Sequence, residues 1–395
     1  MRVAKIEMHK VRIPLKREIR HASHSRNFTD NLVIKVTLDS GIAGYGEGLP
    51  RDYVTGETID TSCELLKKTD FAGQLGDPQN WQSAVESISR FQLPKVPGDD
   101  RECNGNAARC ALEIALLDAY GKHFGESLAS LCALRAPELA ESVSQVRYSM
   151  VITSAKGRRL ALRVLGYWTY GFRQIKIKVG IPGYDDPKRV KVARSFGGRK
   201  MGIRLDANEA WTLEEALSEL GAMKTLGIQW VEQPLRHEDC SQLAKLRSES
   251  GARVMLDESL CSRIDAERAI AGNWCDLFNL RISKCGGFLP TLELARIARR
   301  AGLSCQLGCQ VGETAILSAA GRMFAQSVGG LEALEGSYDR HLVKEALGTK
   351  DLTFGLGGKA PALKGAGLGI ELRPGALESV TLAKEDLWER GNASG

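Results

Sequence analysis

The chain has 395 residues, of which 43% are hydrophobic and 26% are charged, and its formal net charge is +6 at pH 7. These proportions are typical of a globular protein and exclude a disordered or fibrous chain. The length suits two or three domains. No stretch approaches the roughly 20 apolar residues of a membrane-spanning helix, and no basic stripe is interleaved with aromatic residues. We therefore expect neither a nucleic acid nor a membrane as partner.

The ten cysteines are scattered along the chain without a CxxC pair. The N-terminus alternates charged and apolar residues and lacks the apolar core of a signal peptide, so we expect a reducing, cytoplasmic location. Cys305 and Cys309, the closest pair, are better explained as small buried residues than as a zinc site. The six histidines form no HExxH motif, so a histidine-based metal site is not expected either.

The first 130 residues predict an α+β unit. Alternating runs separated by glycine-containing turns indicate strands up to about residue 50, and residues 58–92 have a helical pattern. Residues 106–124 follow the helical period until Gly125 ends it. Strands followed by helices, segregated in sequence, are typical of this class. We assign Glu113 and Asp118, in the 106–124 segment, to structural ion pairs or capping.

From about residue 145, short β-rich runs alternate with long helical patterns. Strands are predicted at residues 146–152, 173–180, 201–208, 228–234, 252–259, 276–283, 303–308 and 331–336. Marker residues near the strand ends recur about every 26 residues, which favours a (β/α) barrel. An open doubly wound sheet is disfavoured because no GxGxxG motif follows a first strand. The glycine-rich tail from about residue 345 is expected to pack back on the N-terminal unit.

Charged residues lie where the predicted barrel strands end. Asp206 in RLDAN, Glu232 in VEQP and Asp257 in LDES are carboxylates on consecutive strands. The carboxyl ends of barrel strands meet at the face that holds the active site, so these side chains are expected to converge. Close carboxylates repel one another unless a cation lies between them. All-oxygen ligation suits Mg²⁺ or Mn²⁺ rather than zinc, and we expect no organic cofactor.

Three lysines accompany the carboxylates. Lys176 and Lys178 lie in IKIKVG on the second barrel strand, and Lys284 lies in ISKCGG after the sixth. The second and sixth strands of a closed eight-stranded barrel are opposite each other, so Lys178 and Lys284 are predicted to face each other. Lys176 points the same way as Lys178, and their like charges are expected to lower one pKa toward about 7–8. Two such lysines can remove and return a proton on either face of a carbon, while the metal stabilises an enediolate.

Each motif alone has a simpler explanation. A KxK pair is usually a solvated strand face, and the DAN and DES motifs could cap the next helix through Asn208 and Ser259. The combination favours a function because chemically consistent residues recur at strand ends in phase with the repeat.

These motifs resemble those of the enolase superfamily, and within it the muconate-lactonizing-enzyme subgroup. The match includes IKIKVG, RLDAN, VEQP, LDES and DLFNLRISKCGG, with GYGEG, VTGET and GAGLGI on either side. The resemblance implies an α/β fold, a (β/α)₇β barrel with an α+β capping domain formed by the N-terminal segment and the C-terminal tail. We expect the capping domain at residues 1–130, the barrel at 131–345 and the returning segment at 346–395.

The resemblance also implies roles for single residues. Enolase-superfamily sites are known to combine a lysine or histidine base with Mg²⁺. The implied set is the acid/base pair Lys178 and Lys284, the pKa modulator Lys176, the metal ligands Asp206, Glu232 and Asp257, and Asn208 and Glu258 behind the ligands.

Reactions within the subgroup include cycloisomerisation, dehydration to o-succinylbenzoate, racemisation of N-acyl amino acids and epimerisation of dipeptides. PRDYVTGET is most similar to the dipeptide epimerases. Those enzymes carry Asp-x-Asp after the eighth strand to bind the substrate ammonium, whereas this chain keeps one acid, Glu335. Their capping-loop arginine is matched most nearly by His24, with Arg26 close by. The predicted substrate contacts are Glu335, His24, Arg51 and Ser149.

The leading hypothesis is a Mg²⁺-dependent epimerase or racemase of a dipeptide or amino-acid derivative, a homo-oligomer that binds a small carboxylate substrate. The second is a cycloisomerase or dehydratase with the same site. A 1,1-proton transfer needs two bases, whereas an elimination can use one base and a cation. A catalytically silent barrel would have lost a lysine or a ligand, and a Schiff-base aldolase barrel would not require three carboxylates.

Overall fold

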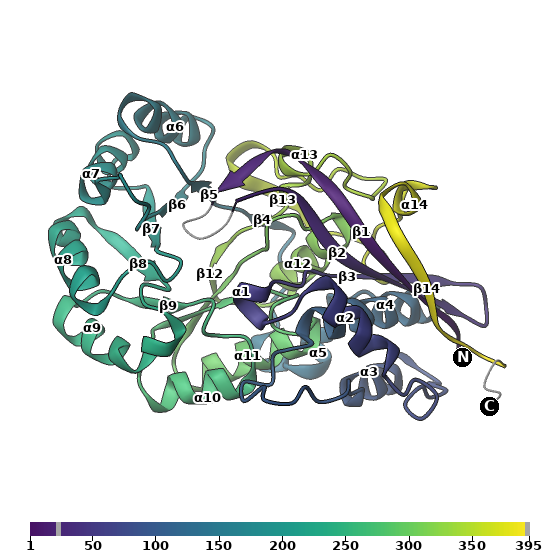
Figure 1. The fold of residues 1–395 in the computed structure, drawn as a ribbon. Helices are drawn as coiled ribbons and strands as arrows, with labels where there is room; N and C mark the ends of the chain where they lie inside the picture. The colour runs from purple at the N-terminus through teal and green to yellow at the C-terminus, as the bar shows by residue number, and fades with distance from the viewer. Residues whose placement is uncertain (21–24, 392–395) are drawn as a thin grey trace.

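The structure is a computed structural model that describes residues 1–20 and 25–391. An antiparallel sheet with its helices forms the capping domain, and a curled parallel sheet surrounded by helices forms the barrel (Figure 1). This is the fold class that the sequence predicts. The boundaries at residues 130 and 345 stay predictions.

The capping sheet contains strands from both ends of the chain. Its order is β14-β1-β2-β3, and its strands are β1 (Val3–Arg20), β2 (Ser25–Leu38), β3 (Ala43–Gly48) and β14 (Thr381–Glu389). β14 pairs antiparallel with β1, beside the purple strands in Figure 1. The C-terminal tail therefore completes the capping sheet, as the sequence predicts.

The helices of the capping domain are α1 (Asp52–Thr55), α2 (Ile59–Lys67), α3 (Trp81–Arg90), α4 (Asn106–Phe124) and α5 (Ser130–Arg135). The glycines of GYGEG explain how closely α4 packs on β3. Gly44, Gly46 and Gly48 alternate along β3, so they share one face. A Cβ atom at Gly46 would lie 1.9 Å from the carbonyl oxygen of Ala111 in α4. Only glycine leaves room for the backbone of the helix there.

An ion cluster holds the three longest strands of the capping sheet together. Glu7 on β1 is 5% exposed, and its carboxylate lies 2.5 Å from Nζ of Lys384 on β14 and 3.2 Å from Nζ of Lys35 on β2. Burial raises the pKa of Glu7, but the two ammonium groups outweigh it and lower the pKa to about 2.

The barrel sheet has eight strands, and each neighbouring pair is parallel. The strands are β5 (Met150–Ile152), β6 (Gln174–Lys178), β7 (Gly202–Asp206), β8 (Ile228–Glu232), β9 (Val254–Leu256), β10 (Leu277–Leu280), β11 (Ser304–Leu307) and β12 (Leu331–Leu334). The backbone N–H of Ser149 donates to the carbonyl of Leu334 at 2.8 Å. This bond brings the start of β5 to the end of β12.

A helix follows each of the first seven barrel strands. They are α6 (Gly157–Thr169), α7 (Asp186–Gly197), α8 (Leu213–Met223), α9 (Leu243–Ser250), α10 (Arg263–Ala271), α11 (Phe288–Arg300) and α12 (Ala315–Ser327). The prediction of one strand at residues 146–152 is wrong. β4 (Gln145–Arg147) pairs antiparallel with β13 (Lys359–Pro361) outside the barrel, and only Met150–Ile152 joins it. The C-terminal tail supplies the partner, which a local pattern cannot reveal.

Acidic side chains of α4 join the parts of the molecule. Glu113 accepts hydrogen bonds from the backbone N–H groups of Phe288 and Leu289 at the start of α11. Asp118 accepts from Leu368 N at 2.8 Å and pairs with Lys122. Both residues therefore have the structural roles that the sequence predicts.

All ten cysteines are free, and nine are buried. No helix within residues 1–20 and 25–391 combines the length and apolar character that a membrane crossing requires.

Candidate active site

The carboxyl ends of the barrel strands carry a ring of charged side chains. Each member is either the last residue of a strand or the residue that directly follows it. In chain order they are Lys178 on β6, Asp206 on β7, Glu232 on β8, Asp257 after β9, Arg281 after β10 and Glu335 after β12. The three carboxylates predicted as metal ligands are fully buried here.

Cationic groups lie between these carboxylates. Lys176 Nζ is 3.1 Å from a carboxylate oxygen of Asp206 and 3.1 Å from one of Glu232. Arg281 pairs with Asp257 and lies 3.5 Å from Glu232. In the part of the chain that the structure describes, no three Asp, Glu, His or Cys side chains form a ready-made metal cage. The cations supply the positive charge that neighbouring carboxylates require.

The surroundings shift the pKa values of these carboxylates in different directions. Burial raises the pKa of Asp206, but Lys178 and Lys176 outweigh it and hold the pKa well below its usual range. Burial and the charge of Asp206 raise the pKa of Glu232 to about 8. A buried, oxygen-only donor set of this kind fits Mg²⁺, because a divalent cation would keep all three carboxylates ionised. The residues present therefore fit the ion that the sequence predicts.

The two lysines of β6 have different surroundings. Lys176 is 2% exposed, and its Nζ is 2.8 Å from Glu335 in addition to its contacts with Asp206 and Glu232. Lys178 donates to Asp206 at 2.7 Å. Burial lowers the pKa of Lys176, but the surrounding carboxylates raise it well above its usual value. The lowered pKa expected from lysine–lysine repulsion is thus not found at Lys176, because three carboxylates outweigh one ammonium.

Loop residues after β7 and β8 support the ring. Asn208 has φ 44° and donates through its side chain to Glu258 at 3.0 Å, while its amide oxygen accepts from Lys178. Gln233 is fully buried and accepts a hydrogen bond from the backbone N–H of Asp257 at 3.0 Å. The sequence analysis missed Gln233, although it follows a predicted ligand directly in VEQP.

Two cationic residues follow β10, and their surroundings differ. Lys284 is 1% exposed, and its Nζ donates to the carbonyls of Asp257 and Asn279 and to a carboxylate oxygen of Asp257 at 3.0 Å. Arg281 directly follows the strand and pairs with Asp257. The sequence analysis missed Arg281. The available signal was its position 24 residues after Asp257, in phase with the repeat.

Two of the predicted substrate contacts, Glu335 and Ser149, bond to other residues inside the barrel. Glu335 is 5% exposed and lies 2.8 Å from Lys176 and 3.1 Å from Arg204. Ser149 donates to the carbonyl of Leu334 at 2.9 Å and accepts from Arg204. Arg204, which the sequence analysis did not single out, is fully buried. Contact of Glu335 or Ser149 with a substrate stays a prediction.

The other two predicted substrate contacts, Arg51 and His24, come from the N-terminal segment. Arg51 is 4% exposed and donates to Thr29 Oγ1 at 2.8 Å and to the carbonyl of Val311 at 3.1 Å. It therefore joins β2 to the loop before α12, and its contact with a substrate stays a prediction. His24 lies outside the described residues.

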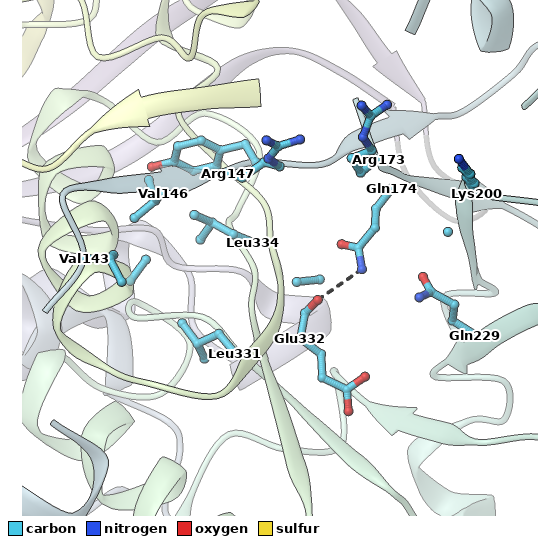
Figure 2. A pocket seen from close by; sticks show the side chains of 14 residues that line it. Val143, Val146, Arg147, Arg173, Gln174, Lys200, Gln229, Leu331, Glu332 and Leu334 are labelled. Carbon is cyan, nitrogen blue, oxygen red and sulfur yellow. Dashed lines mark hydrogen bonds between the residues drawn. The ribbon is translucent and has the colours of Figure 1, made fainter. Parts of the chain in front are cut away.

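Two cavities lie at different ends of the barrel. One of about 470 Å³ is lined by Gln174, Gly202 and Gln229 near the amino ends of their strands, so it lies away from the charged ring. Figure 2 shows Gln174 there, bonded to the carbonyl of Glu332. The other, of about 360 Å³, lies between the capping domain and the barrel and is lined by Glu258 among others. This second cavity therefore reaches the residue next to Asp257.

Two family models match the two parts of the chain. The model described as "Enolase C-terminal domain-like" matches residues 159–376, and the N-terminal domain model of mandelate racemase and muconate lactonizing enzyme matches residues 4–132. The chain belongs to the enolase superfamily. It is an enzyme of the mandelate racemase and muconate lactonizing enzyme group.

Relatives with named activities cover most of the chain. The N-succinyl-L-Arg/Lys racemase of Bacillus cereus is 29% identical over 98% of this chain and 99% of that protein. The hydrophobic dipeptide epimerase of Enterococcus faecalis is 28% identical over 80% of this chain and 84% of its own length. The crystal structure of the Bacillus cereus racemase matches with a TM-score of 0.84, 26% identity and coverage of 98% and 100%.

A dipeptide epimerase structure from Enterococcus faecalis, complexed with Mg and the dipeptide L-Leu-L-Tyr, matches with a TM-score of 0.80. It is 26% identical and covers 94% of this chain and 100% of its own.

Proposed function

We propose that this enzyme is a Mg²⁺-dependent epimerase or racemase that removes the proton α to the carboxylate of a dipeptide or an N-acylated amino acid. The observation that carries the proposal is the set of buried carboxylates Asp206, Glu232 and Asp257, of which Asp206 and Glu232 lie directly beside the lysines of β6. The named activities of the relatives support the substrate class.

The residues of the chain have distinct tasks in this reaction. Lys178, as the neutral amine, takes the α-proton, and the electron pair of the broken C–H bond moves into the carboxylate to form an enediolate. Bound Mg²⁺, held by Asp206, Glu232 and Asp257, would supply positive charge for the substrate carboxylate. Asn208 orients Lys178 through its amide oxygen. In the two-base form of the proposal, Lys284 returns a proton on the opposite face.

A second candidate reaction is favoured by one observation. Arg281 places a permanent cation at the end of β10. A site with one base and one cation suits elimination or cycloisomerisation of a small carboxylate.

Exchange of the α-proton in D₂O tests the proposal. The probes are N-succinyl-lysine, N-succinyl-arginine and Leu-Tyr, each in both configurations at the carbon α to the carboxylate. We expect exchange with Mg²⁺, its loss in EDTA, and its recovery with Mg²⁺ or Mn²⁺. Exchange by a metal-free preparation, verified by elemental analysis, would contradict the metal assignment. No exchange from any probe with the loaded enzyme would contradict the substrate class. Inversion without loss of water or ring closure separates the two candidate reactions.

The predicted homo-oligomer and the cytoplasmic location stay predictions. Light scattering of the purified protein measures its subunit number.

A further inference from the structure

We infer that Arg281, rather than Lys284, faces Lys178 across the reacting carbon, and that Lys178 is the only general base that residues 1–20 and 25–391 supply to this site. The inference rests on the proposed α-proton removal and defines which residues act on the two faces of the substrate. Lys178 and Arg281 have these positions whether the reaction inverts the α-carbon or eliminates a group from the substrate.

Arg281 and Lys284 differ in their position relative to the end of β10. Arg281 directly follows β10, as Asp257 directly follows β9 and Glu335 directly follows β12. Lys284 lies three residues farther on, in the turn that precedes α11. Since side chains at strand ends form the active face of a barrel, the sixth strand presents Arg281 to that face, and Lys284 lies behind it.

The cationic side chains of the site also differ in their exposure to solvent. The side chain of Lys178 is 10% exposed and that of Arg281 is 12% exposed. The side chain of Lys176 is 3% exposed and that of Lys284 is fully buried. Each side of the site therefore has one cation that solvent reaches and a second cation behind it. Lys178 and Arg281 are the outer pair, so they are the two that a substrate can meet.

Lys284 uses its donors inside the protein. Its ammonium has three N–H donors, and the three acceptors around Nζ are the carbonyl of Asp257, the carbonyl of Asn279 and a carboxylate oxygen of Asp257. Lys284 is therefore a positioning residue that fixes Asp257.

Arg281 differs from Lys284 in its hydrogen bonding. Its guanidinium pairs with Asp257, but in the described part of the chain its buried Nε has no hydrogen-bond partner. An arginine has five donors and no acceptor, and it remains protonated in proteins. Arg281 can stabilise negative charge on the substrate but cannot take a proton from carbon.

The two faces of the substrate are consequently unequal. Lys178 removes the α-proton from one stereoisomer and can return it, or a solvent deuteron, to the same face. A proton that arrives on the face of Arg281 comes from water, and the proton that Lys178 has taken passes to solvent and neutralises the hydroxide that forms. Exchange without inversion should therefore precede inversion, and it should start from one stereoisomer only.

Proton exchange in D₂O tests this with the Mg²⁺-loaded enzyme and the stereoisomer pairs above. We expect exchange from one stereoisomer to exceed that from the other at least tenfold. Lys178→Ala should lower it by about 10²–10⁴-fold and leave no exchange from the other isomer. Arg281→Lys replaces a fixed cation by a titratable amine and should increase exchange from the other isomer. Comparable exchange from both isomers of the unaltered enzyme, with Lys178→Ala stopping only one, would overturn the inference.

Chemical labelling tests the inference without a substrate, so failure of the proposed function does not affect it. Acetic anhydride labelling of the native enzyme, read by mass spectrometry, should modify Lys178 at least tenfold faster than Lys284. Phenylglyoxal should modify Arg281 in the native protein more slowly than surface arginines but faster than the fully buried Arg204. Equal reactivity of Lys178 and Lys284, or an Arg281 no more reactive than Arg204, would refute the outer position of Arg281.

Discussion

Glu335, directly after β12, offers a comparison between a buried ion pair and an exposed one on that strand. Its carboxylate faces Lys176 at 2.8 Å and Arg204 at 3.1 Å, and none of the three side chains is more than 4% exposed. Glu332, three residues earlier on β12, pairs with Arg253 at 2.6 Å, but those side chains are 31% and 42% exposed. The substitutions Glu335→Gln and Glu332→Gln are chemically identical, but the first removes the partner of two buried cations and the second the partner of one exposed cation.

The expected magnitudes follow from that difference. Glu335→Gln removes the negative charge shared by two buried cations, and breaking a buried pair in this way costs about 3–5 kcal/mol. Water can solvate Arg253 when its partner is neutral, so Glu332→Gln should cost at most about 1 kcal/mol. Glu335 pairs with two cations of the protein, Lys176 and Arg204, and not with an ammonium group of the substrate. Its loss should therefore lower activity equally on ammonium-bearing and N-acylated probes.

Urea unfolding followed by circular dichroism measures the free energies, and the slopes of the two variants should match that of the unaltered enzyme. The steady-state KM for Leu-Tyr and for N-succinyl-lysine provides the second measurement. Similar stability losses in both variants would refute the assignment of Glu335 to a buried network. A rise in KM confined to the ammonium-bearing probe would instead restore Glu335 as a substrate contact.

Two further predictions concern the capping domain. Because the pKa of Glu7 is lowered to about 2 from 4.5 in the folded state, its contribution is complete above about pH 4.5 and is lost as the pH falls toward 2. Glu7→Gln should remove at most about 3 kcal/mol at pH 7 and little at pH 2, and an equal loss at both pH values in urea titrations would contradict this. Gly46→Ala should cost about 1–3 kcal/mol or more, because its Cβ would overlap the Ala111 carbonyl. Gly166→Ala, in α6 with open space around it, should be neutral or stabilising by calorimetry, and equal losses would refute the steric argument.

The repeat along the chain was sufficient to predict the barrel and most of its charged ring. A strand must end at the same face in every βα unit, so a period of about 26 residues places Asp206, Glu232 and Asp257 together without any knowledge of the contacts. The structural roles of Glu113 and Asp118 were also predicted, since acids in a largely apolar helix need partners nearby. The pattern of hydrophobic residues and the spacing of the motifs can be read directly from the sequence.

The tertiary structure alone decided which cation faces the substrate. Arg281 and Lys284 are three residues apart in the same motif, and their order along the chain does not reveal which side chain turns toward backbone carbonyls. The engagement of Glu335 with Lys176 and Arg204 depends on three different strands, and so does the pKa of Lys176, which neighbouring carboxylates raise. The sequence by itself determined that Lys178, Asp206 and Glu232, with Asp257 and Glu335, meet at the end of the barrel, but it did not reveal Arg281. The packing of the side chains decided which charges pair with one another and which stay accessible to a ligand. A buried charge is shielded from water, so its energy depends mainly on its nearest partners.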